Sequence, residues 1–141
     1  MTTQSKPVVV PVPSDEDREY WEAAKQGKLL IQKCGGCNRL RHFPTMGCPH
    51  CGTMKWTWVQ ASGKGTIYSW IIVHPPVLPA FQDKVPYNVI LVQLEEGTRM
   101  ISNMVECPND QIKIGMPVEV VFEKVTEQIT LPKFRPAKSA R

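Results

Sequence analysis

Cys34-Gly35-Gly36-Cys37 and Cys48-Pro49-His50-Cys51 are two C-x-x-C turns separated by ten residues. Each such turn directs two thiolates toward one point, and two turns complete a tetrahedron of sulfurs about 2.3 Å from a Zn²⁺ ion. Glycines lie inside the first turn and directly after the second, where tight thiolate-binding turns need them. The spacing therefore predicts a zinc site. Its ligands are Cys34, Cys37, Cys48 and Cys51.

Three other uses of the cysteine pairs fit less well. A disulfide pair would need an oxidising compartment, and residues 1–12 lack the charged start and long apolar run of a signal peptide. A redox C-x-x-C usually occurs once and opens a helix in a βαβ unit, and neither condition holds here. Iron in a rubredoxin-like site uses similar spacing, so the choice between zinc and iron stays open.

A closed quartet of sulfurs leaves no coordination position for water or substrate. We therefore expect the metal to stabilise the fold and to take no part in catalysis. His42 and His50 lie near the site in the sequence. Because the quartet is already complete, we expect both histidines at the surface or beside the ligands.

Length, composition and charge narrow the remaining possibilities. The 141 residues, 42% of them apolar, suffice for one domain or for two small modules that share a core. No stretch approaches the roughly 18 apolar residues of a membrane span. The formal charge of +4 falls to about +2 when four thiolates (−4) and one Zn²⁺ (+2) are counted, which is too small to argue for a polyanionic partner. The odd cysteine, Cys107, and a reduced quartet both favour the cytoplasm.

The first part of the chain predicts an extended lead, a helix and a ribbon. Residues 1–13 carry prolines and form the lead. A helix is expected over residues 14–28, with Ser14 as its N-cap, acidic residues in its first turn and Gly27 after its last turn. Short strand patterns surround the cysteine pairs, and no helix-forming stretch separates them. A zinc ribbon is therefore expected over residues 29–55.

The second part of the chain, residues 56–136, is rich in strand patterns and ends in a basic tail at residues 137–141. Runs of β-branched and aromatic residues separated by turn residues predict five strands. Five strands, one long loop and an acidic-glycine hairpin suit a small Greek-key barrel of the oligonucleotide/oligosaccharide-binding (OB) type, with a two-sheet sandwich as the alternative. The predicted fold class is mainly β: an N-terminal helix, a rubredoxin-like zinc ribbon and a five-stranded OB-fold barrel.

For three surfaces the sequence is compatible with two different roles. The helix face formed by Tyr20, Trp21 and Ala24 either packs on the rest of the protein or docks a partner. The loop His74–Pro86 contains four prolines and several apolar residues, and it either caps the open end of the barrel or forms a wall for a ligand or partner. The basic tail is either solvated and inert or contacts a phosphate-bearing ligand or an acidic partner.

A set of short motifs occurs in a fixed order over roughly residues 14–136. These motifs are Tyr20-Trp21-Glu22, the cysteine quartet, Gly65-Thr66-Ile67-Tyr68-Ser69-Trp70, His74-Pro75-Pro76, Pro79-Ala80-Phe81, Pro86-Tyr87, Leu94-Glu95-Glu96-Gly97 and Ile114-Gly115-Met116-Pro117-Val118-Glu119-Val120. In this combination the chain is similar to the zinc-ribbon/OB-fold accessory proteins, formerly a domain of unknown function, that are associated with acyl-CoA thiolases and steroid side-chain aldolases. The resemblance implies a fold of helices, rubredoxin-like ribbon and OB barrel.

The resemblance implies a function as the non-catalytic subunit of an acyl-CoA thiolase or aldolase complex. In such a hetero-oligomer the thiolase-like partner cleaves or forms the carbon–carbon bond. Thiolase chemistry needs an activated cysteine, a histidine base and an oxyanion hole, and Cys107 has no evident histidine partner. We therefore assign no catalytic residue to this chain.

A CoA ester needs cations for its phosphates and apolar surface for its adenine and pantetheine groups. Basic side chains of the ribbon and the apolar loop between the first barrel strands could supply them. The residues expected to contact acyl-CoA or the partner are Trp21, Arg39, Arg41, His74, Phe81 and Tyr87.

Two other functions stay open. A zinc-ribbon/OB module that binds single-stranded nucleic acid would need exposed aromatic residues that alternate with cations. Tyr68 and Trp70 instead lie among Ile67, Ile71 and Ile72 and are expected to be buried. A stand-alone CoA-ester-binding protein without an obligate partner is the other possibility. No membrane partner is expected.

Overall fold

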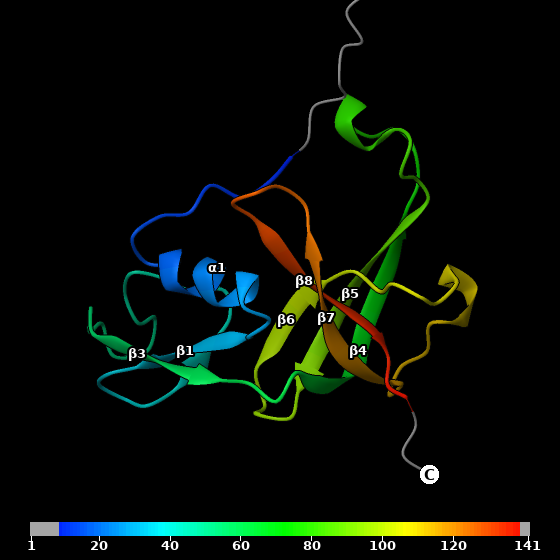
Figure 1. Cartoon of the computed structure of the whole chain (residues 1–141). Coiled ribbons are helices and arrows are strands. Elements are labelled where there is room, and N and C mark those ends of the chain that lie inside the picture. Colours follow the sequence, from blue (N-terminus) through cyan, green and yellow to red (C-terminus); the bar gives the residue numbers. More distant parts are fainter. Residues whose placement is uncertain (1–8, 139–141) are drawn as a thin grey trace, which may run out of the picture.

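The structure is a computed structural model, and it describes residues 9–138 of the chain. Within these residues, one α-helix and two sheets form the fold. The smaller sheet has the strand order β2-β1-β3 and carries the cysteine turns, and the larger has the order β6-β5-β4-β7-β8 and curls on itself (Figure 1). The first residues of the expected lead and the last three of the basic tail lie outside the described range.

Helix α1 (Arg18–Lys25) is shorter at its start than the helix predicted from the sequence. Asp17, and not Ser14, occupies the N-cap position, and its carboxylate accepts a hydrogen bond of 2.6 Å from the Ser14 backbone N–H. This bond stabilises a turn ahead of the helix. At the other end, Gly27 takes φ +74° and its N–H donates back to the last helical turn, as does that of Lys28. The predicted glycine after the last turn is therefore confirmed.

The ribbon sheet consists of β1 (Leu30–Cys34), β2 (Leu40–Arg41) and β3 (Trp56–Gln60). Strand β1 lies in the centre and pairs antiparallel with both neighbours. The sequence pattern assigned the residues of β3 to the start of the barrel region. The hydrogen bonds of β3 run instead to β1, with Leu30 opposite Gln60 and Cys34 opposite Trp56. The alternation of Trp56 and Trp58 indicated a strand without indicating its partner.

The larger sheet contains the five strands expected for the barrel. Gly65 lies where β4 runs between β5 and β7, and a Cβ at this position would meet the Gln93 carbonyl oxygen at 2.5 Å. Short 3₁₀ helices, η1 (Pro79–Phe81) and η2 (Asn109–Gln111), lie in its connections. The strands are β4 (Lys64–Val73), β5 (Tyr87–Leu94), β6 (Arg99–Ser102), β7 (Pro117–Lys124) and β8 (Thr130–Pro136).

The two edges of this sheet meet just after β6, where the chain pairs in parallel with β8. Phe134 donates its N–H to the Asn103 carbonyl at 3.0 Å and accepts from Val105 at 2.7 Å. The buried Asn88 side chain supports this closure, because its amide donates to the Met104 carbonyl at 3.0 Å and accepts from the Met104 N–H at 2.6 Å. The curled five-stranded sheet is thus partly closed, which confirms the predicted OB-type fold class.

One apolar core joins the helix, the ribbon and the barrel. The barrel side chains at its centre, Ile67, Ile90, Val92 and Phe134, are almost completely buried. The ribbon adds further side chains, and α1, which lies beside the barrel and over the ribbon sheet (Figure 1), adds the predicted face. The helix face therefore packs on the rest of the protein, and the docking alternative for it is not needed.

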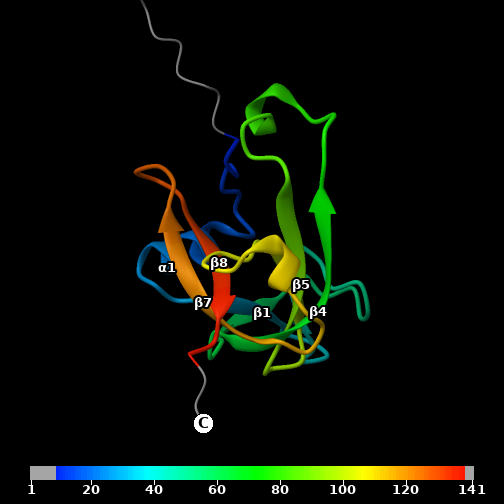
Figure 2. The same cartoon turned by 90° about the vertical axis from the view of Figure 1, so that its right-hand side faces the viewer.

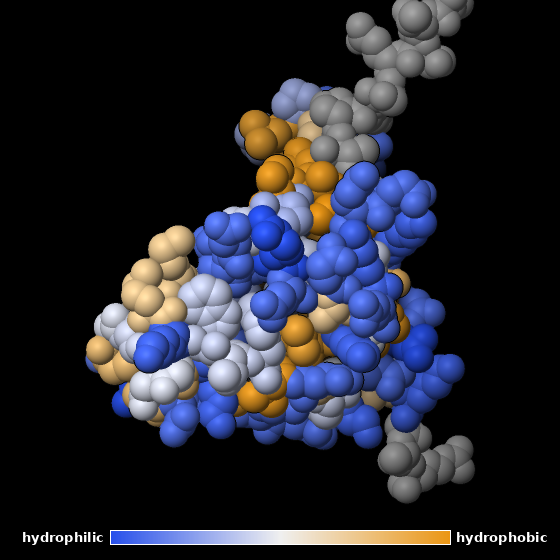
Figure 3. All heavy atoms as spheres, turned by 60° about the vertical axis from the view of Figure 1, so that its left-hand side comes forward, coloured by the Kyte–Doolittle hydropathy of each residue, from blue (hydrophilic) through white to orange (hydrophobic). Residues whose placement is uncertain are grey.

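The loop between β4 and β5 projects away from the body of the protein at the end of a long hairpin (Figure 2). It does not fold back across the barrel, so of the two alternatives for this loop the exposed wall is the one the fold allows. Apolar side chains gather near this end of the molecule, whereas hydrophilic side chains dominate much of the face seen in Figure 3. No helix within residues 9–138 is long and apolar enough to cross a membrane.

Candidate metal centre and contact surfaces

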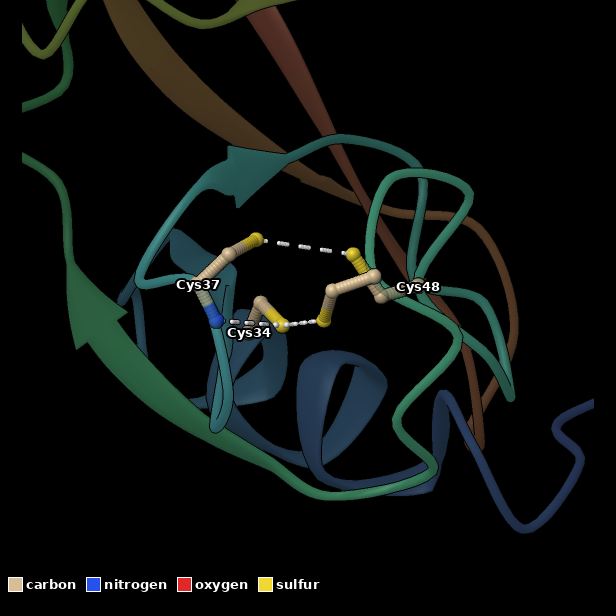
Figure 4. Close-up of side chains that lie close together, drawn as sticks. Cys34, Cys37 and Cys48 are labelled. Atoms are coloured by element: carbon tan, nitrogen blue, oxygen red, sulfur yellow. Dashed lines mark hydrogen bonds between the residues drawn. The ribbon is translucent and has the colours of Figure 1, made fainter.

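The four predicted cysteines come together at the end of the ribbon. Their sulfur atoms all lie within 4.8 Å of one another. The Sγ atoms of Cys34 and Cys51 are 3.4 Å apart, and those of Cys37 and Cys48 are 3.7 Å apart. Figure 4 shows Cys37 and Cys48 directing their thiols toward each other from the two turns. In a zinc tetrathiolate the sulfurs are about 3.8 Å apart, so the four cysteines could hold such an ion.

Backbone N–H groups of each turn point at the sulfurs and favour the thiolate form. The N–H groups of Gly36 and Cys37 each lie 3.3 Å from the Cys34 Sγ, and that of His50 lies 3.4 Å from the Cys48 Sγ. The hydrogen bond from Cys37, together with that from Gly36, lowers the pKa of Cys34 to about 6 even though burial opposes the shift. Hydrogen bonds from the Cys51 and His50 backbone likewise lower the pKa of Cys48. The first cysteine of each turn is thus favoured as a thiolate, the form that binds metal.

A buried amide holds the second cysteine loop against β1. The Gln32 side chain is completely buried, and its Oε1 accepts hydrogen bonds from Arg41 Nε at 2.6 Å and from the Thr45 N–H at 2.7 Å. Arg41 also donates to the Thr45 carbonyl at 3.2 Å. Arg41, which we expected to contact CoA or the partner, is therefore part of the ribbon's internal support.

The two histidines near the site have different surroundings. His42 Nε2 lies 2.9 Å from the hydroxyl of the buried Tyr20, and burial lowers the pKa of His42 to about 4. It joins the ribbon to α1 as a neutral side chain. His50 is exposed and its Nδ1 lies 2.6 Å from a guanidinium nitrogen of Arg39. Arg39, a second residue expected at the contact surface, is also exposed and remains accessible.

Of the other predicted contact residues, two are brought together at the base of the projecting loop, one lies elsewhere on that loop and one is buried. Trp21 is buried in the shared core, so any role it has in a complex must act through packing. His74 is exposed on the projecting loop. The rings of Phe81 and Tyr87 lie 5.8 Å apart at its base, with Lys84 Nζ 5.5 Å from the Phe81 ring centre. The loop therefore presents aromatic residues next to β5.

Within the described residues, two cations near the C-terminal end already form ion pairs. Lys133 and Arg135 lie on β8 and bind Glu123 at 2.7 Å and Glu119 at 2.9 Å, respectively, on the adjacent strand β7. The Arg135 guanidinium lowers the pKa of Glu119. Lys138 stays exposed beside an open hollow of about 550 Å³ between the starts of β4 and β7. Of the described cations in this segment, Lys138 is the one left to meet a ligand.

One prediction about the aromatic residues is wrong. Tyr68, which was expected to be buried, is 45% exposed, and Ile71 of the same strand is 61% exposed. Tyr68 faces outward because it follows the buried Ile67 in the strand. The β-bulge between Ile67 and Ser69 then shifts the alternation by one residue, so that Ile71 also faces outward. The outward position of Tyr68 next to Ile67 could be read from the alternation of the sequence, whereas the bulge that exposes Ile71 could not.

Cys107 is half-buried and follows the barrel closure. Its thiol lies 3.5 Å from the Pro108 carbonyl oxygen, which can accept a hydrogen bond from it.

A four-cysteine ribbon, a bridging helix and a partly closed OB-type sheet define the class of protein: a zinc-ribbon/OB-fold protein. Two family descriptions match the two parts separately. Residues 21–55 match the ChsH2 rubredoxin-like zinc ribbon domain, and residues 58–123 match the ChsH2 C-terminal OB-fold domain.

The chain belongs to the ChsH2 family, also known as DUF35. It is 40% identical to a DUF35 domain-containing scaffold protein of Methanothermobacter thermautotrophicus, over 79% of this chain and 84% of that protein. It is also similar to a solved chain described as Ltp2-ChsH2(DUF35) aldolase, with a TM-score of 0.79 and 46% identity, over 91% of this chain and 99% of the other. The resemblance seen in the sequence is therefore confirmed.

A longer relative carries a different description. The chain is 47% identical to a probable enoyl-CoA hydratase alpha subunit of Thermomonospora curvata, over 96% of its own length. It spans 43% of the length of that relative. The similarity thus concerns the zinc-ribbon and OB part of the longer protein.

Proposed function

We propose that this chain is the non-catalytic zinc-binding subunit of an acyl-CoA aldolase or thiolase complex. In this complex a thiolase-like partner would cleave or form the carbon–carbon bond. The chain would complete the partner's surface and contribute to binding of the CoA ester. The observation that carries the proposal is the similarity, at 46% identity over 99% of the other chain, to a component of an aldolase structure.

The arrangement of the chain is consistent with a scaffold. Its polar groups of greatest chemical interest, the four thiols, point at one another and would be saturated by one metal ion. Arg41, Lys133 and Arg135 are engaged in internal contacts. Exposed apolar side chains instead occupy one face of the barrel and the projecting loop. Such exposure is typical of a surface that is covered in an assembly.

The metal in this proposal is a structural Zn²⁺ ion. The expected content is about one zinc per chain, with iron as the alternative that metal analysis would detect. For the CoA ester, Arg39, His74, Phe81 and Tyr87 are the accessible candidates, because Trp21 is buried and Arg41 is engaged. The enzyme that holds the reacting thioester is the partner.

Co-expression with a thiolase-like subunit tests the proposal. The two chains should purify as one complex, and acyl-CoA cleavage should require both. The partner alone, assayed at the same concentration, is the necessary control. Full activity of the partner alone, or turnover of a CoA thioester by this chain alone, would contradict the proposal.

A stand-alone role as a CoA-ester-binding protein predicts a different result. The isolated chain would then be a monodisperse monomer that binds a CoA ester with the same affinity whether or not the partner is present. Gel filtration and calorimetry with acetyl-CoA separate the two cases.

A further inference from the structure

The outer face of strands β4, β5 and β6 carries large apolar side chains. Paired residues of an antiparallel sheet point to the same side, and the register pairs Ile71 with Val89 and Leu91 with Ile101. These side chains therefore lie opposite the core residues Ile90 and Val92. Ile71 is 61% exposed and Ile101 is 68% exposed. Nothing in the described part of the chain covers them.

The same four side chains line a shallow hollow of about 170 Å³. Toward the projecting loop the apolar surface continues through Tyr87, which pairs with Val73 across the hairpin and packs near Phe81. Figure 2 shows this hairpin rising as one continuous feature from the barrel to the loop. The surface is thus an extended strip and not a set of isolated exposed residues.

One cation lies at the edge of this strip. Tyr68 faces outward at the β-bulge, and the guanidinium carbon of Arg99 lies 3.8 Å from the centre of the Tyr68 ring. A guanidinium group over an aromatic ring can still bind a carboxylate through its N–H groups. Among the ion pairs of residues 9–138, none involves Arg99. We call the whole surface the outer patch; it comprises Tyr68, Ile71, Val89, Leu91, Arg99 and Ile101.

The composition of the outer patch indicates which kind of molecule could bind to it. A single-stranded nucleic acid would need a track of cations beside the stacking ring, but the other exposed members of the patch are aliphatic. An apolar centre with a charged edge is the usual arrangement of a protein–protein interface. A stacked arginine at that edge favours a partner that presents a carboxylate.

We propose that the outer patch is the docking surface for the catalytic subunit. The partner contributes an apolar surface that covers Ile71 and Ile101 and a carboxylate that binds Arg99. This inference rests on the proposed function, because that function supplies the partner. It adds which face of the chain the partner covers and by what chemistry.

Two lysine substitutions test the apolar centre. Ile71→Lys and Ile101→Lys each place a charge where the partner must bury apolar surface, and each should weaken binding by about 30-fold or more. Ile114→Lys is the matched control, because Ile114 is 71% exposed but lies on the connection before β7 and outside the patch. It should change the affinity less than about threefold. Calorimetry with the purified partner measures all three, with circular dichroism and metal content verifying the fold.

Two substitutions of Arg99 test its role, one that removes the charge and one that keeps the charge but changes the shape of the side chain. Arg99→Gln should weaken binding by about tenfold at low salt, and raising the ionic strength should reduce the difference. Arg99→Lys keeps the charge but loses the planar fork, so it should fall between the wild type and Arg99→Gln.

The possible failures are distinguishable. If the wild-type chain forms no complex with the partner, the proposed function fails. If the wild type binds but Ile71→Lys and the milder Ile101→Ser bind equally well, only the docking surface is wrong. Oligonucleotide binding that Tyr68→Ala abolishes, with partner binding unchanged, would overturn the docking surface in favour of a nucleic-acid site.

Discussion

The ribbon and the barrel reach a stable fold in different ways. The barrel has a centre of closely packed side chains, among them Ile67, Ile90 and Phe134, each at most 1% exposed. The cysteine loops of the ribbon have few apolar contacts, and Met46 and Met54 are exposed there. Four thiols and a buried polar support around Gln32 take the place of a core. The ribbon should therefore depend on its metal, and the barrel should not.

Loss of a metal ligand should have the largest effect. Cys48→Ser should abolish stoichiometric metal binding and unfold the cysteine loops, because structural zinc supplies on the order of 10 kcal/mol to such a ribbon. Amide resonances of the barrel should persist in a heteronuclear NMR spectrum while those of the loops collapse. Cys107→Ser is the control and should retain about one metal ion per chain. Simultaneous loss of the barrel resonances would mean that the two regions form one cooperative unit.

A substitution that leaves a cavity in the barrel should cause the next largest loss of stability. Phe134→Ala removes a side chain that is 0% exposed, and it should lower the free energy of unfolding by about 4 kcal/mol. Urea denaturation followed by circular dichroism measures the change. The same substitution on the projecting loop, Phe81→Ala, should cost less than about 1 kcal/mol. The metal content should stay unchanged in both variants, and its loss in Phe134→Ala would show that the ribbon needs the barrel.

The polar closure of the barrel should contribute somewhat less. Asn88→Ala leaves the buried N–H and carbonyl of Met104 without their side-chain partner, which should cost about 3 kcal/mol. Asn109→Ala removes a single, more exposed partner of Asn88 and should cost about 1 kcal/mol or less. Equal stabilities of the two variants in urea denaturation would argue against Asn88 as the residue that closes the sheet.

The smallest expected effect is a pH dependence at the junction of helix and ribbon. The pKa of His42 is about 4 in the folded protein and 6.5 in the unfolded chain, so the unfolded state binds the extra proton. The stabilisation is fully present above pH 6.5 and is lost as the pH falls toward 4. At pH 5 the loss should be about 2 kcal/mol.

His42→Gln separates this effect from acid release of the metal. The glutamine stays neutral at every pH and can still accept a hydrogen bond from Tyr20. Between pH 7 and pH 5 the variant should therefore lose about 2 kcal/mol less stability than the wild type. This difference is the part of the loss that the protonation of His42 causes. Identical pH dependence of the two proteins would exclude His42 as its source.

Much of the fold followed from local sequence patterns. The two C-x-x-C turns predicted the ribbon because a metal site needs only ligands at a short, fixed spacing. Gly27 predicted the end of α1 because few other residues tolerate its positive φ. The predicted start of the helix was wrong, because Asp17 and not Ser14 occupies the N-cap position. The Asp17 carboxylate accepts a hydrogen bond from the Ser14 N–H in a turn ahead of the helix.

The contact surface was harder to predict than the metal site. Arg41 was expected to bind a ligand but supports the ribbon, and Trp21 was expected at an interface but lies in the core. The sequence shows that a residue is charged or aromatic. Whether its side chain is free to bind a ligand depends on neighbours that are distant along the chain. Gln32, Asn88 and the exposed Ile71 carried no local signal of their roles.

The cysteine spacing, the order of helix, ribbon and barrel, and the five barrel strands could be derived from the chain alone, because each depends on residues close together in sequence. The tertiary structure decided which face of an apolar strand is buried, which cations are already paired and how the sheet closes. A period-two pattern divides a strand into two faces without stating which one meets the core. When both faces are apolar, as in β4, packing with the other strands makes that choice, and it leaves Ile71 at the surface.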